Sequence, residues 1–136
     1  MATTKSYTDL DQSKKLAKIL QTESADMFCA DVFNKEEETH SYNFHILSTW
    51  GCNTFEELKD RENKFVRFIP CWSIAALMKI IEIDKSEICF DCYGEKYRVN
   101  VHYQTLGSFC QDNELYESKI DALFAMIIKL HKRNLL

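Results

Sequence analysis

The chain has 136 residues, of which 46% are hydrophobic and 28% are charged, with only 3 glycines and 1 proline. This composition excludes disordered and fibrous proteins, and the length predicts a single globular domain over residues 1–136. The formal net charge of -4 argues against a nucleic-acid groove, which needs clustered Lys and Arg.

The chain carries no apolar run near the roughly 20 residues that a membrane-spanning helix needs, and its first residues form no hydrophobic leader. We therefore expect a cytoplasmic protein with no membrane partner. In a reducing compartment cysteines stay unpaired, so we expect free thiols. The six cysteines are Cys29, Cys52, Cys71, Cys89, Cys92 and Cys110.

The first part of the chain has signals for a helix followed by a hairpin. Thr8 lies where a helix N-cap belongs and Asp11 follows three residues later, which predicts a helix near residues 8–20. Aromatic and branched residues then predict the two strands of a hairpin over residues 27–47. The acidic run Glu36–Glu38 is the expected turn between these strands.

Two further helices are predicted from their caps. Thr54 begins the sequence Thr-Phe-Glu-Glu, which matches the capping box and predicts a helix over residues 55–62. Ser73 can cap a mostly apolar helix near residues 73–82. Between these helices we expect an extended stretch that ends at Pro70, because proline disfavours helix at the residue before it.

The second half of the chain predicts another hairpin and a long helix. Apolar and polar residues alternate over residues 87–103, on both sides of Gly94-Glu95. A glycine at the first central position suits a type II′ turn. The last helix, near residues 118–133, begins at Ser118 and carries a broad apolar stripe.

The order of these elements predicts the α+β class, because hairpins take the place of repeated βαβ crossovers. We predict one antiparallel sheet of about four to five strands, built from the hairpins over 27–47 and 87–103 and covered by helices. The predicted helices lie near residues 8–20, 55–62, 73–82 and 118–133.

Three blocks near the beginning, middle and end of the chain are distinctive as a set: Thr8–Leu20, Ile69–Leu77 and Ile120–Leu130. In that order they resemble a family of small uncharacterised proteins of gut anaerobic bacteria, often carried in phage-like or mobile genetic regions. The resemblance implies an intracellular accessory protein of phage or mobile-element origin. It brings no activity, cofactor or catalytic residue with it.

The segment Cys89–Cys92 has the Cys-x-x-Cys spacing of zinc and dithiol sites. It lies in a predicted strand, where side chains three residues apart point to opposite faces, and the sequence offers no second pair of ligands. We therefore expect no metal and no cofactor, with Cys92 buried and Cys89 more exposed. A cysteine remains a candidate nucleophile if His45 or His102, both in predicted strands, meets it across a sheet.

Four aromatic side chains are the candidate binding residues. Trp72 precedes the predicted cap Ser73, where it either packs against the helix or stands outward as a binding anchor, and packing is the stronger interpretation. Tyr93, Tyr97 and Tyr103 can present an aromatic sheet face to the bases of a single strand. A half-buried sheet is the simpler interpretation of these tyrosines.

The sequence has no recognisable catalytic constellation, and no catalytic residue is assigned. Together with the resemblance, this favours a noncatalytic protein-interaction or regulatory module of a phage or mobile element. The expected partners are a host or phage protein, or a second copy of the chain. A small cysteine- and histidine-dependent enzyme is the first alternative. Single-stranded nucleic-acid binding is the second, although the charge balance disfavours nucleic acid.

Overall fold

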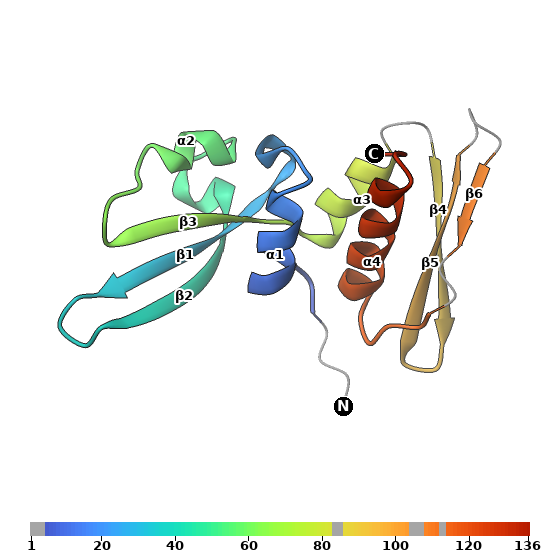
Figure 1. Cartoon of the computed structure of the whole chain (residues 1–136), viewed down its shortest axis with the longest axis horizontal. Coiled ribbons are helices and arrows are strands. Elements are labelled where there is room, and N and C mark those ends of the chain that lie inside the picture. Colours follow the sequence, from blue (N-terminus) through green and yellow to red (C-terminus); the bar gives the residue numbers. More distant parts are fainter. Residues whose placement is uncertain (1–4, 83–85, 104–107, 112–113) are drawn as a thin grey trace. The chain divides into compact units, whose positions relative to one another are not determined.

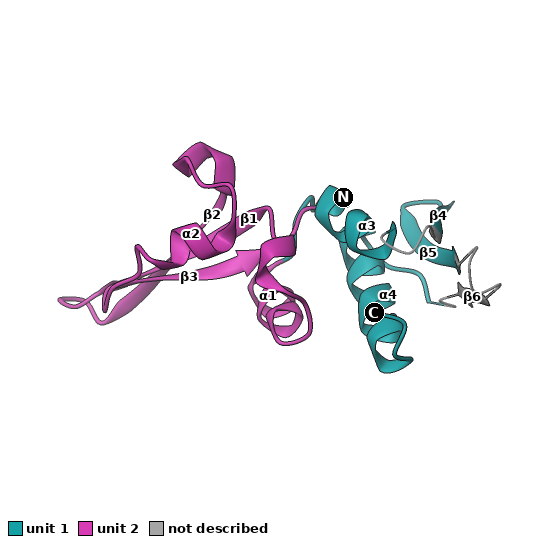
Figure 2. Cartoon of the chain, turned by 90° about the horizontal axis from the view of Figure 1, so that it is seen from above, with its two compact units in different colours: residues 1–8, 74–136 teal, residues 9–73 magenta. Residues whose placement is uncertain are grey.

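The computed structural model describes residues 5–82, 86–103, 108–111 and 114–136 (Figure 1), and the side chains of residues 86, 103 and 108–111 lie outside the described part. The contacts divide the chain into two compact units, coloured separately in Figure 2. Unit 1 joins residues 1–8 to residues 74–136, and unit 2 comprises residues 9–73. The single-domain organisation stays a prediction.

Unit 2 is built around an antiparallel sheet of three strands in the order β2-β1-β3. β1 (Met27–Asn34) and β2 (Thr39–Ile46) form the predicted hairpin. β3 (Val66–Cys71) pairs with the other side of β1, which makes β1 the central strand. β3 continues one residue beyond Pro70, the predicted end of this extended stretch.

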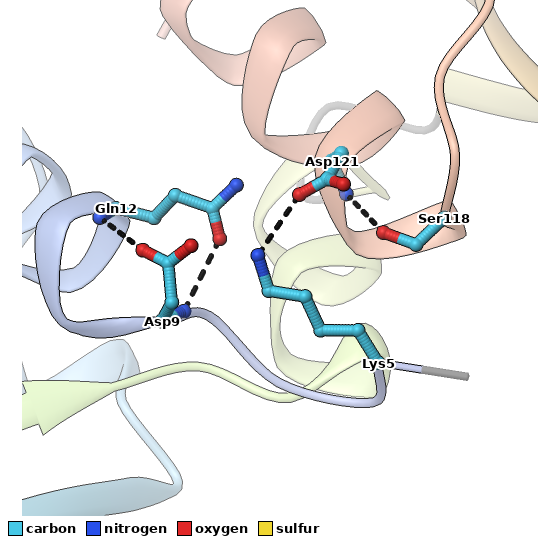
Figure 3. Close-up of polar contacts among 5 residues, drawn as sticks. All are labelled: Lys5, Asp9, Gln12, Ser118 and Asp121. Atoms are coloured by element: carbon cyan, nitrogen blue, oxygen red, sulfur yellow. Dashed lines mark hydrogen bonds and ion pairs between the residues drawn. The ribbon is translucent and has the colours of Figure 1, made fainter. Parts of the chain in front are cut away.

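Helical segments accompany this sheet: α1 (Leu10–Ala17), η1 (Thr22–Ser24), η2 (Leu47–Trp50) and α2 (Phe55–Lys59). The cap of α1 is Asp9, one residue after the predicted Thr8. Asp9 Oδ1 accepts from Gln12 N at 2.8 Å, and Gln12 Oε1 accepts from Asp9 N at 3.2 Å (Figure 3). Thr8 and Asp11 have the same spacing, but the longer Gln12 side chain is the better partner for a cap N–H.

Both α1 and α2 are shorter than predicted, ending at Ala17 and Lys59. The start of α2 is confirmed, because Thr54 Oγ1 accepts from Glu57 N at 3.4 Å. α1 packs against the other face of β3, where Ser13 Oγ donates to Cys71 Sγ at 3.2 Å. The core under η2 and α2 consists of Phe28, Ala30, Leu47, Cys52, Phe55, Leu58 and Phe68.

Unit 1 contains a second antiparallel sheet, with strands in the order β4-β5-β6. Its elements are α3 (Ile74–Glu82), β4 (Ser86–Tyr93), β5 (Lys96–Tyr103), β6 (Ser108–Gln111) and α4 (Lys119–Lys132). β4 and β5 form the predicted hairpin, and Gly94 has φ 65°, the positive value that the first central position of a type II′ turn requires. β6 has no counterpart among the predicted elements.

The mixed helix-and-sheet class with antiparallel pairing is confirmed, but the prediction of one sheet of about four to five strands is wrong. The two hairpins lie in separate sheets of three strands each. Residue alternation specifies a hairpin because its strands are neighbours in sequence, but it does not specify which other strand joins them. β1 takes β3 as its second neighbour and β5 takes β6, so the hairpins do not pair with each other.

The core of unit 1 forms where α4 packs against β5 and α3 (Figure 1). Ser118 begins α4 as predicted, since its Oγ accepts from Asp121 N at 3.1 Å. Lys5 Nζ lies 2.9 Å from Asp121 Oδ1, and this ion pair holds the N-terminal segment to the first turn of α4 (Figure 3). Fully buried residues here include Leu77, Val99, Val101, Ile120, Leu123, Met126, Ile127 and Leu130.

Candidate functional site

The sheet of unit 2 ends in two edge strands, β2 on one side of β1 and β3 on the other (Figure 1). Along an antiparallel strand, alternate residues turn their backbone N–H and C=O groups toward the neighbour and away from it. In β3 the odd-numbered residues face β1, because Phe33 N donates to Phe65 O at 2.8 Å in continuation of the β1–β3 register. The outward backbone groups of β3 therefore belong to Val66, Phe68 and Pro70.

The outward N–H positions of β3 are closed. Val66 N donates to Asn63 Oδ1 at 3.0 Å, and Phe68 N donates to Glu62 Oε2 at 3.0 Å. Pro70, the third outward residue, has no N–H group. Proline is a common device for keeping another strand off a sheet edge, and an N–H already bonded to a side chain acts in the same way. β3 is thus a closed edge.

The outward edge of β2 is different. Leu47 N donates to Asp26 O at 3.1 Å in continuation of the β1–β2 register, so the even-numbered residues of β2 face outward. Among the residues that the structure describes, the backbone N–H and C=O groups of His40 and Tyr42 have no hydrogen-bond partner. Such groups are the donors and acceptors that an added strand uses.

The side chains of β2 leave this edge unprotected. The strand is eight residues long and contains no Asp, Glu, Lys, Arg or Pro. Natural edge strands commonly carry a charged residue or a proline, which discourages pairing with another chain. Tyr42 and Ile46 are 43% and 51% exposed, so β2 combines open backbone groups with exposed apolar side chains.

Tyr42 is held in place near the middle of the open edge. His40 Nδ1 lies 2.6 Å from Asp31 Oδ1, so the ring N–H donates to the carboxylate. The Tyr42 ring stacks on this fixed imidazole, with centroids 6.1 Å apart and planes inclined by 11°. A side chain that is already ordered loses little conformational entropy on binding, which makes Tyr42 a suitable anchor.

A second exposed aromatic residue, Trp50, lies in η2, directly after β2. Its ring packs edge-on against Phe28 at 5.2 Å and lies 5.5 Å from the His45 ring, yet 40% of the residue is exposed. Arg61 Nη1 donates to the Trp50 carbonyl at 3.2 Å. Gly51 ends η2 with a φ of 70°, in the left-handed region that favours glycine. This glycine is the signal in the sequence that could have located the end of η2.

Of the four aromatic residues predicted from the sequence, Trp72 is completely buried. Its Nε1 donates to Ser24 Oγ at 2.9 Å, which satisfies the polar end of the ring. The adjacent Ser73 is tied to Asp26, whose Oδ1 accepts from Ser73 N at 2.9 Å. A buried indole offers no surface to a partner, so the structure favours the packing interpretation over the binding one.

The three candidate tyrosines do not share one sheet face. Tyr97 lies opposite Cys92, on the face of β5 that carries the buried Val99. Tyr93 lies opposite Lys96, on the other face, and is 54% exposed. Tyr103 has the parity of Tyr97, but its side chain lies outside the described residues. The proposed aromatic platform for nucleic-acid bases is therefore not formed by Tyr93 and Tyr97.

The face of the β4–β5 hairpin that carries Tyr93 is polar. Asp91 Oδ2 accepts from Arg98 Nη2 and Asn100 Nδ2, each at 2.8 Å, and Tyr93 Oη accepts from Arg98 Nη2 at 3.0 Å. The hydrogen bond to Asp91 is the main cause that raises the pKa of Arg98. Asn100 is buried, and its Oδ1 has no hydrogen-bond partner among the described side chains. This network fixes Arg98 within its own sheet.

The cysteines divide into buried and exposed thiols. Burial raises the pKa of the Cys71 thiol to about 12, and burial followed by the charge of Asp31 raises the pKa of Cys29. Cys89 and Cys92 are both exposed and lie on opposite faces of β4, so the predicted burial of Cys92 is wrong. Cys92 is close to the hairpin turn, where its Sγ donates to Gly94 O at 3.3 Å.

The histidine candidates lie in different sheets, since His45 is in β2 and His102 is in β5. They are therefore not cross-strand neighbours, and the His45 ring packs against Phe28 instead, at 5.4 Å. In the β4–β5 register Cys89 lies opposite Asn100, and His102 lies two residues further along the same face. The structure thus brings an exposed thiol and an imidazole to one sheet face.

Comparison of the chain with protein-family models, curated proteins and solved structures finds no match. Among the described residues, no helix has the length and apolar character needed to span a bilayer. The described side chains also contain no group of three or more His, Cys, Asp or Glu placed to hold a metal ion. The open edge of β2 is the feature that the described geometry singles out.

Proposed function

We propose that the chain is a noncatalytic protein-interaction module, which binds an extended polypeptide segment by adding it as a strand to β2. The contrast between the two edges of one sheet supports this proposal most directly. Outward N–H positions are closed at Val66, Phe68 and Pro70 of β3, whereas His40 and Tyr42 of β2 are open. The candidate partners at this edge are a second copy of the chain and, as the mobile-element resemblance suggests, a host or phage protein.

Main-chain hydrogen bonds supply the affinity in strand addition, and alternate side chains supply the specificity. The exposed Tyr42 and Ile46 would contact apolar side chains on one face of the added strand. An interface of one strand is smaller than the roughly 1,200 Å² of a stable complex, so we expect transient binding. Because β2 has no Asp, Glu, Lys or Arg, selection would favour apolar side chains over a particular charge pattern.

Selection of ten-residue peptides from a displayed random library against the whole chain tests this proposal. Bound peptides should slow amide hydrogen exchange at His40 and Tyr42, measured by NMR at low protein concentration. Tyr42→Pro removes an outward N–H but no bond to β1, and should weaken the selected peptides about tenfold. Asn63→Ala, on the opposite edge, is the matched control and should bind them normally. Peptides that bind equally well to Tyr42→Pro would refute strand addition at β2.

A cysteine-dependent activity is the second candidate function, favoured by the common face of Cys89, Asn100 and His102. The test is the rate at which a neutral thiol reagent labels each cysteine at pH 7. Rapid labelling of Cys89 that slows in His102→Ala, with Cys92 as the exposed reference thiol, would support it. Equal rates at Cys89 and Cys92 in both proteins would eliminate it.

A further inference from the structure

We infer that β2 of a second copy of the chain is the strand that adds to β2, so that a two-fold axis joins two three-stranded sheets into one. This inference rests on the proposed function, because it names the partner that uses the same edge. Three observations support it: the uncharged composition of β2, the register of its outward groups and the position of the acidic turn.

The charge of β2 permits two copies to meet there. A formal charge of -4 on each chain makes the copies repel overall. β2 is an eight-residue segment without Asp, Glu, Lys or Arg, so pairing two of these strands places no like charges opposite each other. In an isologous contact the same strand stands on both sides, so a charged strand would repel its own copy. β2 has no such charges and can therefore pair with itself.

The register of the outward groups fits a two-fold axis at Tyr42. In antiparallel pairing a residue on the axis faces its own counterpart, and the two residues exchange both N–H···O=C bonds. Tyr42 has its N–H and C=O directed outward and without a partner among the described residues. Its ring, held by stacking on His40, would then lie beside the ring of Tyr42 in the second copy.

The acidic turn makes the antiparallel arrangement favourable. With the axis at Tyr42, Thr39 lies opposite His45 of the second copy, and the turn Glu36–Glu38 that precedes Thr39 approaches η2 of that copy. Arg61 is bonded to the Trp50 carbonyl at this end of β2. Each acidic turn would therefore lie near the end of β2 where Arg61 of the other copy is held, and the two acidic turns would lie at opposite ends of the paired strands.

A charge exchange at the axis tests the inference with the full chain. Sedimentation equilibrium should give twice the 16.0 kDa chain mass for the wild type at high concentration. Tyr42→Lys and Tyr42→Glu each place two like charges opposite one another, and each should weaken self-association at least about tenfold. An equimolar mixture of these two variants should dimerise again. Tyr42→Phe keeps the ring and should dimerise like the wild type.

Thermal unfolding of each variant at low concentration checks that the exposed substitution leaves the fold intact. A wild type that stays monomeric, while library peptides protect His40 and Tyr42, would overturn the dimer and leave the proposed function standing. A dimer that Tyr42→Lys does not weaken would overturn the dimer contact at β2. If no peptide binds to this edge either, the proposed function falls with it.

Discussion

β2 and β3 flank the same central strand, but side chains accept hydrogen bonds from the outward amides of β3 and not from those of His40 and Tyr42 in β2. An asparagine stands shortly before each strand, and the two asparagines bond in different ways. Asn63 Oδ1 accepts from the amides of Phe65 and Val66, at 2.8 and 3.0 Å, and so covers the N-terminal end of β3. Asn34 Oδ1 accepts from the turn amides of Glu36 and Glu37, at 3.0 and 3.3 Å, and leaves β2 uncovered. The same residue type closes a turn in one case and a sheet edge in the other.

The contrast shows that edge protection in this sheet is local. Glu62 and Asn63 lie just before β3 and accept from amides at most six residues away, and Pro70 lies within β3 and has no N–H group. Among the described residues no such partner covers the outward groups of His40 and Tyr42 in β2, although an unprotected edge invites pairing with other chains. We therefore interpret the open edge as a binding surface, and substitutions on either side of the sheet can test this distinction.

The largest expected effect comes from the central strand, on which both edges depend. Phe28 is fully buried and packs edge-on against Trp50 and Phe68. Phe28→Ala should lower the free energy of unfolding by about 3 to 5 kcal/mol, because it leaves a cavity beneath the sheet. Urea unfolding measures this loss, and exposed Tyr42→Ala is the control with a much smaller effect. A loss below about 1 kcal/mol would show that the described core does not support the sheet.

Proline at adjacent positions of β2 tests which residues face outward. Asn43 faces β1 and Tyr42 faces away from it. Asn43→Pro should therefore reduce the free energy of unfolding by about 2 kcal/mol more than Tyr42→Pro, because only the former removes a ladder hydrogen bond. Urea unfolding of both variants at low concentration gives the difference. Equal losses would mean that the edge assignment of β2 is wrong.

The sequence predicts local features of the fold because these depend on near neighbours. Both hairpins and the caps Thr54 and Ser118 follow from spacing and alternation alone. The division into two sheets cannot be predicted from these local patterns, because it depends on the pairing of β1 with β3 and of β5 with β6. Strand pairing over longer separations is set by packing of the whole chain, which no short pattern records.

The candidate site was less predictable for the same reason. An edge strand can be identified only from the strand order, and nothing in the sequence of β2 indicates that it lies at an edge. Trp72 is conspicuous in the sequence but fully buried, whereas Tyr42 and Trp50 are exposed and belong to less conspicuous segments. The absence of Asp, Glu, Lys and Arg from β2 can be read from the sequence. It indicates a binding surface only when the structure places β2 at a sheet edge.

Opening the closed edge is expected to have a moderate effect. Glu62→Ala removes the carboxylate that accepts from Phe68 N and should reduce stability by about 1 to 2 kcal/mol. The more direct readout is amide hydrogen exchange at Phe68, which should become faster while Val66 stays protected by Asn63. Glu37→Ala, in the exposed turn of the other hairpin, should change neither amide. Unchanged exchange at Phe68 in Glu62→Ala would show that the carboxylate does not close this edge.

Cys71 is a buried residue of β3, and its thiol makes the stability of the chain depend on pH. Burial raises the pKa of this thiol from its ordinary value of 9.0 to about 12. The folded chain therefore holds the thiol proton more tightly than the unfolded chain does, and this contribution to stability is complete below pH 9 and is lost as pH rises toward 12. Relative to Cys71→Ala, the wild type should lose at most about 1.4 kcal/mol per pH unit in that window. Urea unfolding of both proteins between pH 7 and about pH 10.5 checks this, and parallel stability curves would mean that Cys71 is not buried beneath α1 as described.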